Sequence, residues 1–89
     1  MSIVQLRKKI DSIDTQLIEL LAQRFLVAQK IGDLKKKGGH TITDKAREKE
    51  LTTFHAWLEK KYSLSTKFTK SLWDLIIKES KRIQKISKP

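Results

Sequence analysis

Apolar residues recur from Ile3 to Lys37 at steps that mostly alternate between three and four. The members of this row are Ile3, Leu6, Ile10, Ile13, Leu17, Leu20, Val27, Ile31 and Leu34. That spacing places them on one face and predicts a helix from about Val4 to Lys37, packed along its length against another helix. Gly38 and Gly39 are expected to end it, because glycine favours the left-handed cap and weakens helix propagation.

Two shorter helices are predicted after this one. Asp44 occupies an N-cap position, so the second helix is expected over about 45–61, and Ser65 caps a third over about 66–86. Their inward faces are predicted to hold Leu51, Phe54, Trp57, Leu58, Phe68, Leu72, Leu75, Ile76, Ile83 and Ile86. The chain is therefore expected to be all-α, with three helices in a single domain over 1–89.

The length of the first helix predicts a partner. Thirty or more residues make a rod of roughly 45–50 Å, whereas a compact domain of 89 residues has a radius of gyration of about 12 Å. The rest of the chain is too short to cover such a rod. A second copy of the chain is the natural cover, so we expect a homodimer.

Composition narrows the class of function. The sequence has 20 Lys and Arg against 10 Asp and Glu, a formal charge of +10, which favours an anionic partner or a lysine-rich solvated surface. It has no cysteine and two histidines, too few for a thiolate or histidine metal site. We expect no metal, no cofactor and no membrane span, and with no signal-peptide core the expected compartment is the cytoplasm.

Three cations on the first helix are candidates for binding an anion. Arg24 interrupts the apolar row, which is costly unless an anion meets it. Lys35 shares its face roughly 16 Å away, so the two side chains can hold one small dianion between them. Arg7 lies about 25 Å from Arg24 and can reach the same ligand only from a second chain. Alternatively, Arg24 extends its charged end to water, Lys35 belongs to a solvated helix end and Arg7 is a surface residue.

Polar residues on the two later helices also allow two interpretations. Asp44, Arg47 and Glu48 form the first turn of the second helix, either as a cap with ordinary dipole partners or with Glu48 turned inward to accept a hydroxyl proton beside Arg47. Ser80 and Gln84 continue an apolar stripe of the third helix, either at its solvent edge or as buried groups that need partners.

A basic stripe is predicted on the outer side of the third helix. Its members are Lys78, Lys81, Lys85 and Lys88, with Arg82 adjacent. Such a stripe can follow a phosphate backbone, but no helix-turn-helix glycine, aromatic RNA platform or zinc spacing accompanies it. No catalytic Ser-His-Asp or Cys-His set and no glycine-rich phosphate loop is present, which argues against a hydrolase, kinase or redox enzyme. The segment Ser87 to Pro89 is expected to fray.

Taken together, these residues resemble the all-α chorismate mutases over nearly the whole chain. The stretches that carry the resemblance are 6–11 (LRKKID), 13–14 (ID), 20–24 (LLAQR), 31–35 (IGDLK), 44–48 (DKARE) and 76–84 (IIKESKRIQ). The resemblance implies an intertwined homodimer of three-helix chains, with two sites each lined by both chains. It implies the rearrangement of chorismate to prephenate in phenylalanine and tyrosine synthesis, without cofactor, nucleic acid or membrane.

The resemblance also implies a role for each candidate residue. Arg24 and Arg7 of the partner subunit would hold the two carboxylates of chorismate. Lys35 and Gln84 would donate to its ether oxygen. The remaining candidates would hold the ring hydroxyl (Glu48, helped by Asp44) and complete the anion contacts (Arg47 and Ser80).

Other functions remain open from the sequence. The same fold and cations would serve an isochorismate-pyruvate lyase, although Glu48 as placed for the chorismate hydroxyl argues against it. A basic helical dimer could bind nucleic acid through the outer stripe, and a catalytically inactive regulatory relative is a further alternative. Thr41 departs from the family, where many members have proline, which affects the connection and removes no site group.

Overall fold

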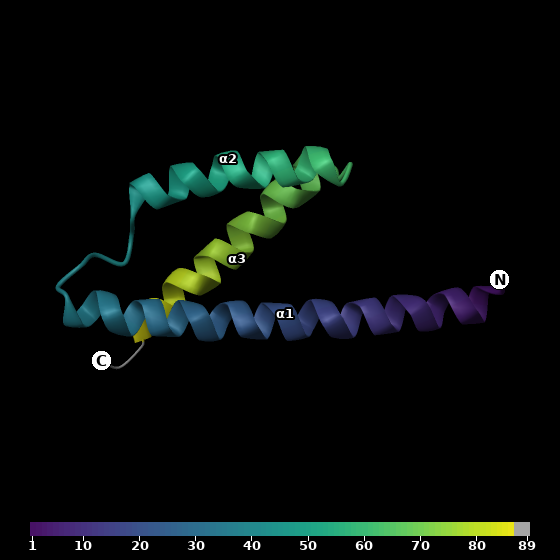
Figure 1. Ribbon diagram of the computed structural model, residues 1–89, viewed down its shortest axis with the longest axis horizontal. Helices are drawn as coiled ribbons and strands as arrows, with labels where there is room; N and C mark the ends of the chain where they lie inside the picture. The colour runs from purple at the N-terminus through teal and green to yellow at the C-terminus, as the bar shows by residue number, and fades with distance from the viewer. Residues whose placement is uncertain (87–89) are drawn as a thin grey trace.

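The computed structural model describes residues 1–86 as three α-helices and their connections. Along the chain they are α1 (Ile3–Lys37), α2 (Lys45–Lys61) and α3 (Thr66–Ile86), and the described residues contain no strand (Figure 1). The all-α prediction is confirmed, and each predicted helix boundary lies within one residue of the observed one. None of the three helices is both long and apolar enough to cross a lipid bilayer.

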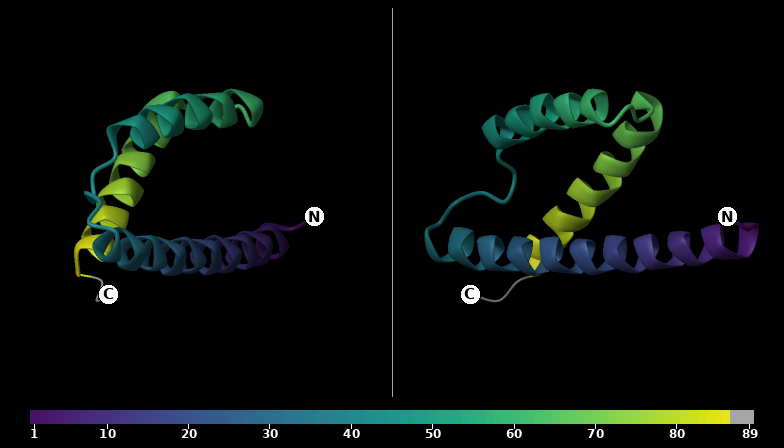
Figure 2. Two further views of the ribbon diagram at one scale, coloured as in Figure 1. Left: turned by 60° about the vertical axis from the view of Figure 1, so that its left-hand side comes forward. Right: turned by 45° about the vertical axis from the view of Figure 1, so that its right-hand side comes forward.

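The helices form an open arrangement in which α3 connects the other two. Helix α3 runs obliquely from the end of α2 down to the C-terminal half of α1, and α2 lies above α1 without packing against it (Figures 1 and 2). The molecule measures 55 × 26 × 16 Å, with a radius of gyration of 16.2 Å. This exceeds the roughly 12 Å of a compact domain of its length, so the chain by itself is not a closed globule.

Local signals fix the ends of the helices. The chain after α1 turns at Gly39, whose φ of +69° is in the left-handed region that glycine adopts readily. Asp44 caps α2 by accepting a hydrogen bond from the backbone N–H of Arg47 at 3.0 Å. The Ser65 hydroxyl accepts one from the backbone N–H of Phe68 at 3.4 Å at the start of α3. These interactions join residues at most three apart, which is why the sequence predicted them.

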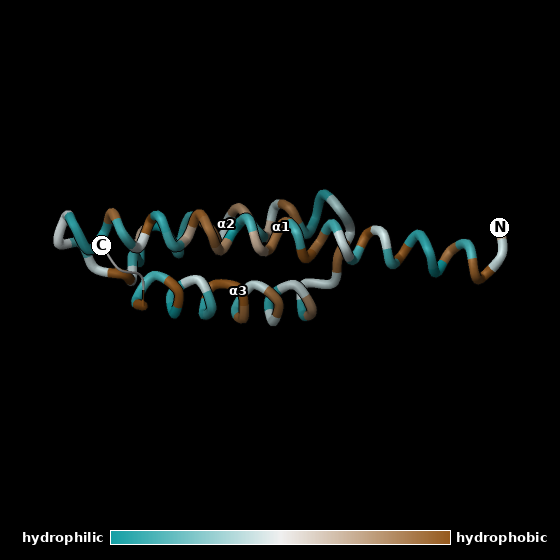
Figure 3. The backbone as a smooth tube through the Cα atoms, turned by 90° about the horizontal axis from the view of Figure 1, so that it is seen from below, coloured by the Kyte–Doolittle hydropathy of each residue, from teal (hydrophilic) through white to brown (hydrophobic). Residues whose placement is uncertain are grey.

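The apolar row of α1 is largely uncovered. Every member is at least 42 % exposed, and Figure 3 shows hydrophobic bands recurring along α1 far beyond the part that α3 crosses. Among the described residues the buried apolar side chains are Ala28 and Ile76. So small a core supplies little hydrophobic stabilisation for a chain of this length.

The predicted inward faces of α2 and α3 are only partly correct for the single chain. The side chains that are more than half exposed are Phe54, Trp57, Phe68, Leu75 and Ile86, whereas Leu51, Leu58, Leu72 and Ile83 are half-buried. Helical periodicity identified the apolar stripes, but an open chain offers no surface to cover all of them.

Helices α1 and α3 cross at Gly32, where the two backbones touch. A Cβ built on Gly32 would lie 2.7 Å from the Cα and 2.9 Å from the carbonyl oxygen of Gln84. Both neighbours are backbone atoms, so a side chain here forces the helices apart. The absence of a side chain at Gly32 therefore sets the distance between α1 and Gln84.

Gly32→Ala is expected to destabilise the fold by about 1–3 kcal/mol through overpacking. This loss occurs even though alanine in a helix interior favours folding by about 1 kcal/mol over glycine. Urea unfolding of both proteins measures the difference. Gly38→Ala is the matched control, because the atoms nearest to its new Cβ belong to the side chain of His40, and the nearest backbone atom, the carbonyl oxygen of Leu34, lies 3.4 Å away. Equal unfolding midpoints for Gly32→Ala and the parent would contradict the backbone contact.

Candidate active site

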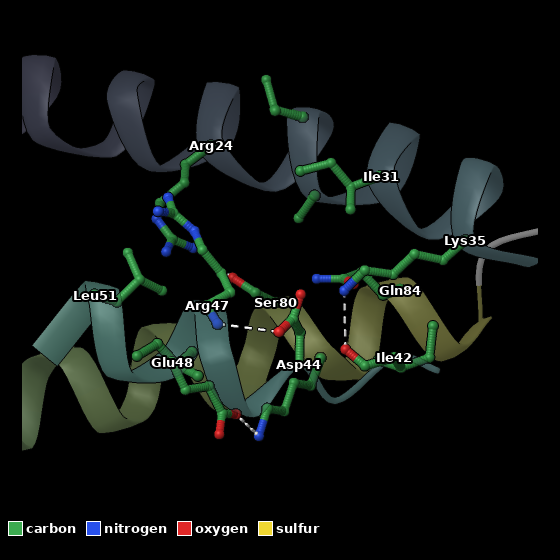
Figure 4. A pocket seen from close by; sticks show the side chains of 14 residues that line it. Arg24, Ile31, Lys35, Ile42, Asp44, Arg47, Glu48, Leu51, Ser80 and Gln84 are labelled. Carbon is green, nitrogen blue, oxygen red and sulfur yellow. Dashed lines mark hydrogen bonds and ion pairs between the residues drawn. The ribbon is translucent and has the colours of Figure 1, made fainter. Parts of the chain in front are cut away.

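A pocket of about 520 Å³ lies between the C-terminal half of α1, the α1–α2 connection, the start of α2 and the second half of α3 (Figure 4). Its polar lining consists of Arg24, Lys35, Asp44, Arg47, Glu48, Ser80, Lys81 and Gln84, and its apolar walls include Val27, Ala28, Ile31, Ile42, Leu51 and Ile77. The structure thus brings together every predicted site residue except Arg7. Arg24, Lys35 and Gln84, for which a solvated position was the alternative, are half-buried and line one cavity.

Arg24 is a half-buried cation anchored at one end of the pocket. Its Nη1 donates to the Ser80 hydroxyl at 2.5 Å, and that hydroxyl in turn donates to the carbonyl oxygen of Ile76 at 2.9 Å. Burial, and secondarily the positive charge of Arg47, lowers the pKa of Arg24 from its usual value. An arginine stays charged even so. Two guanidinium groups extending toward one another from α1 and α2 (Figure 4) therefore favour an anion between them.

Lys35 and Gln84 form a donor pair at the other end of the pocket. The Lys35 ammonium donates to the carbonyl oxygen of Ile42 at 3.0 Å and to the Gln84 Oε1 at 3.1 Å (Figure 4). Because the Gln84 oxygen accepts from Lys35, its amide nitrogen is left to donate to a ligand. The third ammonium proton of Lys35 is likewise left over. The pair can therefore give two hydrogen bonds to one acceptor, one of them from a cation.

The first turn of α2 supplies the acidic groups of the pocket. Asp44 is held by its capping bond, and the Glu48 carboxylate forms an ion pair with the Lys81 ammonium across to α3. The Arg47 side chain is 61 % exposed and pairs with Glu50 at 3.3 Å on the surface of α2. Arg47 therefore lines the pocket as an exposed cation, whereas Arg24 is half-buried and bonded to Ser80.

The predicted position of Lys81 in the outer basic stripe is wrong. The sequence placed it with Lys78 and Lys85 on the outer side of α3, but it lines the pocket and contacts Glu48. The sequence does contain a pattern that indicates the pocket face for Lys81. Ile77, Lys81 and Gln84 follow one another at steps of four and three and so share one face of the helix. Lys88, the last member of the predicted stripe, and the segment Ser87 to Pro89 lie outside the described residues.

Arg7 is the predicted site residue that the pocket of its own chain does not contain. It lies near the N-terminal end of α1, which extends past α2 and α3 (Figure 1), and it is exposed. Its contribution to a site in a second chain stays a prediction.

His55 is buried beside the pocket against α3. Its ring stacks on Trp73 with centroids 3.6 Å apart and planes 3° from parallel, and its exposed fraction is 7 %. Burial, followed by the positive charge of Arg24 and with a further contribution from Arg47, lowers the pKa of His55, while Glu59 acts in the opposite direction. The folded protein thus keeps this histidine neutral to lower pH than the unfolded chain does.

The depressed pKa of His55 predicts a loss of stability in mild acid. Below the ordinary histidine pKa of about 6.5 the unfolded chain binds this proton more readily than the folded one, so the free energy of unfolding falls as the pH falls. His55→Leu removes the titrating group and should flatten this dependence. Urea midpoints measured from about pH 8 to 5, at one protein concentration, provide the comparison. Parallel curves for the two proteins would contradict the assignment.

Among the described residues, no group of three or more histidine, cysteine or acidic side chains is placed to hold a metal ion. The side chains that do converge include Arg24, Arg47 and Lys35, with further hydrogen-bond donors between apolar walls. Such an arrangement binds and orients an anion and stabilises negative charge that develops on it.

Comparison with known proteins relates this chain to a family. A family model described as chorismate mutase type II matches residues 6–85. The chain is 29 % identical over 83 residues to the chorismate mutase of Methanocaldococcus jannaschii, covering 93 % of this chain and 84 % of that protein. It is 36 % identical over 84 residues to the bifunctional chorismate mutase/prephenate dehydratase of Buchnera aphidicola subsp. Acyrthosiphon pisum, covering 94 % of this chain. The chain spans 22 % of the length of that bifunctional relative.

Proposed function

This chain belongs to the chorismate mutase type II family, and from that premise we propose that it catalyses the rearrangement of chorismate to prephenate. The observation that carries the proposal is the placement of Lys35 and Gln84 as a donor pair opposite Arg24 in one pocket. A dianion that also has a central ether oxygen fits this order of groups.

The reaction requires little of a protein except shape and charge. It is a unimolecular Claisen rearrangement, in which the C–O bond of the ether breaks ahead of C–C bond formation. A site must hold the enolpyruvyl arm over the ring in the reactive chair, which is a positioning effect. It must also stabilise the negative charge that grows on the ether oxygen. No nucleophile, metal ion or proton transfer is needed.

Lys35 and Gln84 are proposed to stabilise that charge. Both can donate to one acceptor while their mutual hydrogen bond fixes their orientation. One donor to a developing oxyanion contributes about 3–4 kcal/mol. Lys35 adds a positive charge, and Gln84 adds a neutral donor. A carboxylate in place of the Gln84 amide would repel the negative charge on the ether oxygen.

Arg24 is proposed to hold one carboxylate of chorismate and Arg7 of the partner subunit the other. Ser80 fixes Arg24 through the 2.5 Å hydrogen bond, so the guanidinium is already oriented when substrate arrives. Arg47 adds an exposed cation. Glu48, near the cap residue Asp44, is proposed to accept the hydrogen bond of the ring hydroxyl.

The proposal includes a homodimer in which two α1 helices lie along one another. The exposure of the whole apolar row of α1, and of Phe54, Trp57, Phe68 and Leu75, supports it. Uncovered apolar surface on this scale marks an interface rather than a monomer surface. The small core of the single chain also supports the homodimer, because a chain with so little buried apolar surface is stable only when it associates.

The direct test is a turnover assay on the purified chain with chorismate, following loss of its ultraviolet absorbance and formation of prephenate, together with the mass of the protein in solution. We expect catalysed conversion and twice the mass of one chain. Release of pyruvate from isochorismate without conversion of chorismate would instead indicate the lyase chemistry. Absence of turnover with steeply salt-dependent DNA binding would indicate a nucleic-acid-binding role.

A further inference from the structure

Lys81 is a positively charged residue that lines the pocket but has no role in the reaction proposed above. It comes from α3, one turn before Gln84 on the same face, and its ammonium pairs with the Glu48 carboxylate of α2. The two side chains are 33 % and 35 % exposed, so the pair is partly shielded from water. Both residues also line a second hollow of about 380 Å³, so the pair stands in the wall between the two cavities.

Glu48 creates an electrostatic problem in this site. The proposed substrate carries two negative charges, and a carboxylate beside it repels it. At an effective dielectric constant of about 20 and a separation of about 8 Å, each pair of like charges costs roughly 2 kcal/mol. A site that uses a carboxylate to hold the ring hydroxyl therefore needs a counter-charge close to that carboxylate.

We infer that Lys81 is this counter-charge and a positioning residue, which holds Glu48 in place and neutralises it toward the dianionic substrate. The inference rests on the proposed function. A carboxylate has two oxygens with four lone-pair directions, so one oxygen can stay on Lys81 while the other accepts the substrate hydroxyl. The other charged groups that line the second hollow are Asp74 and Lys78. They form no ion pair with Glu48 among the described contacts.

The expected signature is a change in KM with little change in kcat. The ring hydroxyl keeps its place while the ether bond breaks, so interactions with it act on the bound substrate and the transition state alike. Lys81→Met should raise KM roughly thirtyfold, the factor that corresponds to about 2 kcal/mol from one uncompensated charge, and leave kcat within about twofold. Lys81→Arg should restore KM because it keeps the charge.

The decisive comparison pairs Lys81→Met with Glu48→Gln. Replacing Glu48 alone removes both the hydroxyl acceptor and the charge that needs a counter-ion. If Lys81 acts through Glu48, then adding Lys81→Met to Glu48→Gln should change KM by less than about twofold, so the two effects are strongly non-additive. Lys78→Met is the matched control, since it removes the same charge one turn earlier on α3 without an ion pair to Glu48.

Steady-state kinetics of the parent, the four single variants and the double variant constitute the experiment. An unchanged KM in Lys81→Met, an equal rise in Lys78→Met, or additive effects in the double variant would each overturn the inference. These outcomes leave the proposed function intact, because the parent still converts chorismate. A parent without turnover would remove the proposed function and this inference together. Circular dichroism and the mass in solution establish that each variant is folded and assembled.

Discussion

Lys35→Ala is expected to lower kcat for chorismate by about a thousandfold, the upper end of the loss found when a donor to a developing oxyanion is removed. The Lys35 ammonium is the charged donor of the pair, and its bond to Gln84 also orients the second donor. Both contributions grow with negative charge on the ether oxygen. The loss should therefore fall mainly on kcat, in contrast to the KM effect expected at Lys81.

Two comparisons separate this effect from a general loss of charge or structure. Lys37→Ala removes a lysine from the exposed end of the same helix, outside the pocket, and should retain parent kinetics. Lys35→Ala should unfold at a urea concentration close to that of the parent, because its two hydrogen bonds reach a loop carbonyl and a side chain at the pocket edge. Retention of a tenth or more of parent kcat in Lys35→Ala would contradict the assigned role.

Local chemistry explains what the sequence predicted well. Asp44 and Gly39 act on backbone groups a few residues away, so the helix ends followed from the order of residues alone. The pocket members on α1 followed from helical geometry, which puts Arg24 and Lys35 on one face. The candidates on α2 and α3 each had two interpretations, and the resemblance to a family favoured the functional one, because their position relative to α1 depends on how the helices cross.

Tertiary contacts explain what the sequence did not predict. The spacing of Lys81 from Ile77 and Gln84 could have indicated its face of α3. Its ion pair could not be predicted in this way, because it depends on the position of Glu48 on a neighbouring helix. Similarly, periodicity gives no hint that Gly32 touches the backbone of Gln84, because the partner is 52 residues later in the chain. Contacts of this kind are set by the packing of elements far apart in sequence, where local patterns carry no information.

Arg7 and Arg24 allow the intertwined site to be tested by mixing inactive proteins. Arg7→Ala and Arg24→Ala should each lose most activity, because one substrate carboxylate loses its partner in both sites of the dimer. When the two variants are unfolded together and refolded, half of the dimers are mixed. In each mixed dimer one site carries both substitutions and the other carries neither. The mixture should regain about a quarter of parent activity, as closed two-fold symmetry requires.

A second mixture supplies the control and decides where each residue acts. Arg24 and Lys35 line the pocket of one chain, so in a mixed dimer of Arg24→Ala and Lys35→Ala each site still lacks one of them. No activity should return, although the subunits exchange equally well. No recovery in the mixture with Arg7→Ala would contradict the donation of Arg7 across the subunit boundary. Recovery in the control mixture would contradict the placement of Arg24 and Lys35 in the pocket of one chain. Because both mixtures contain the same folded scaffold at equal protein concentration, their difference reports only which chain supplies which cation.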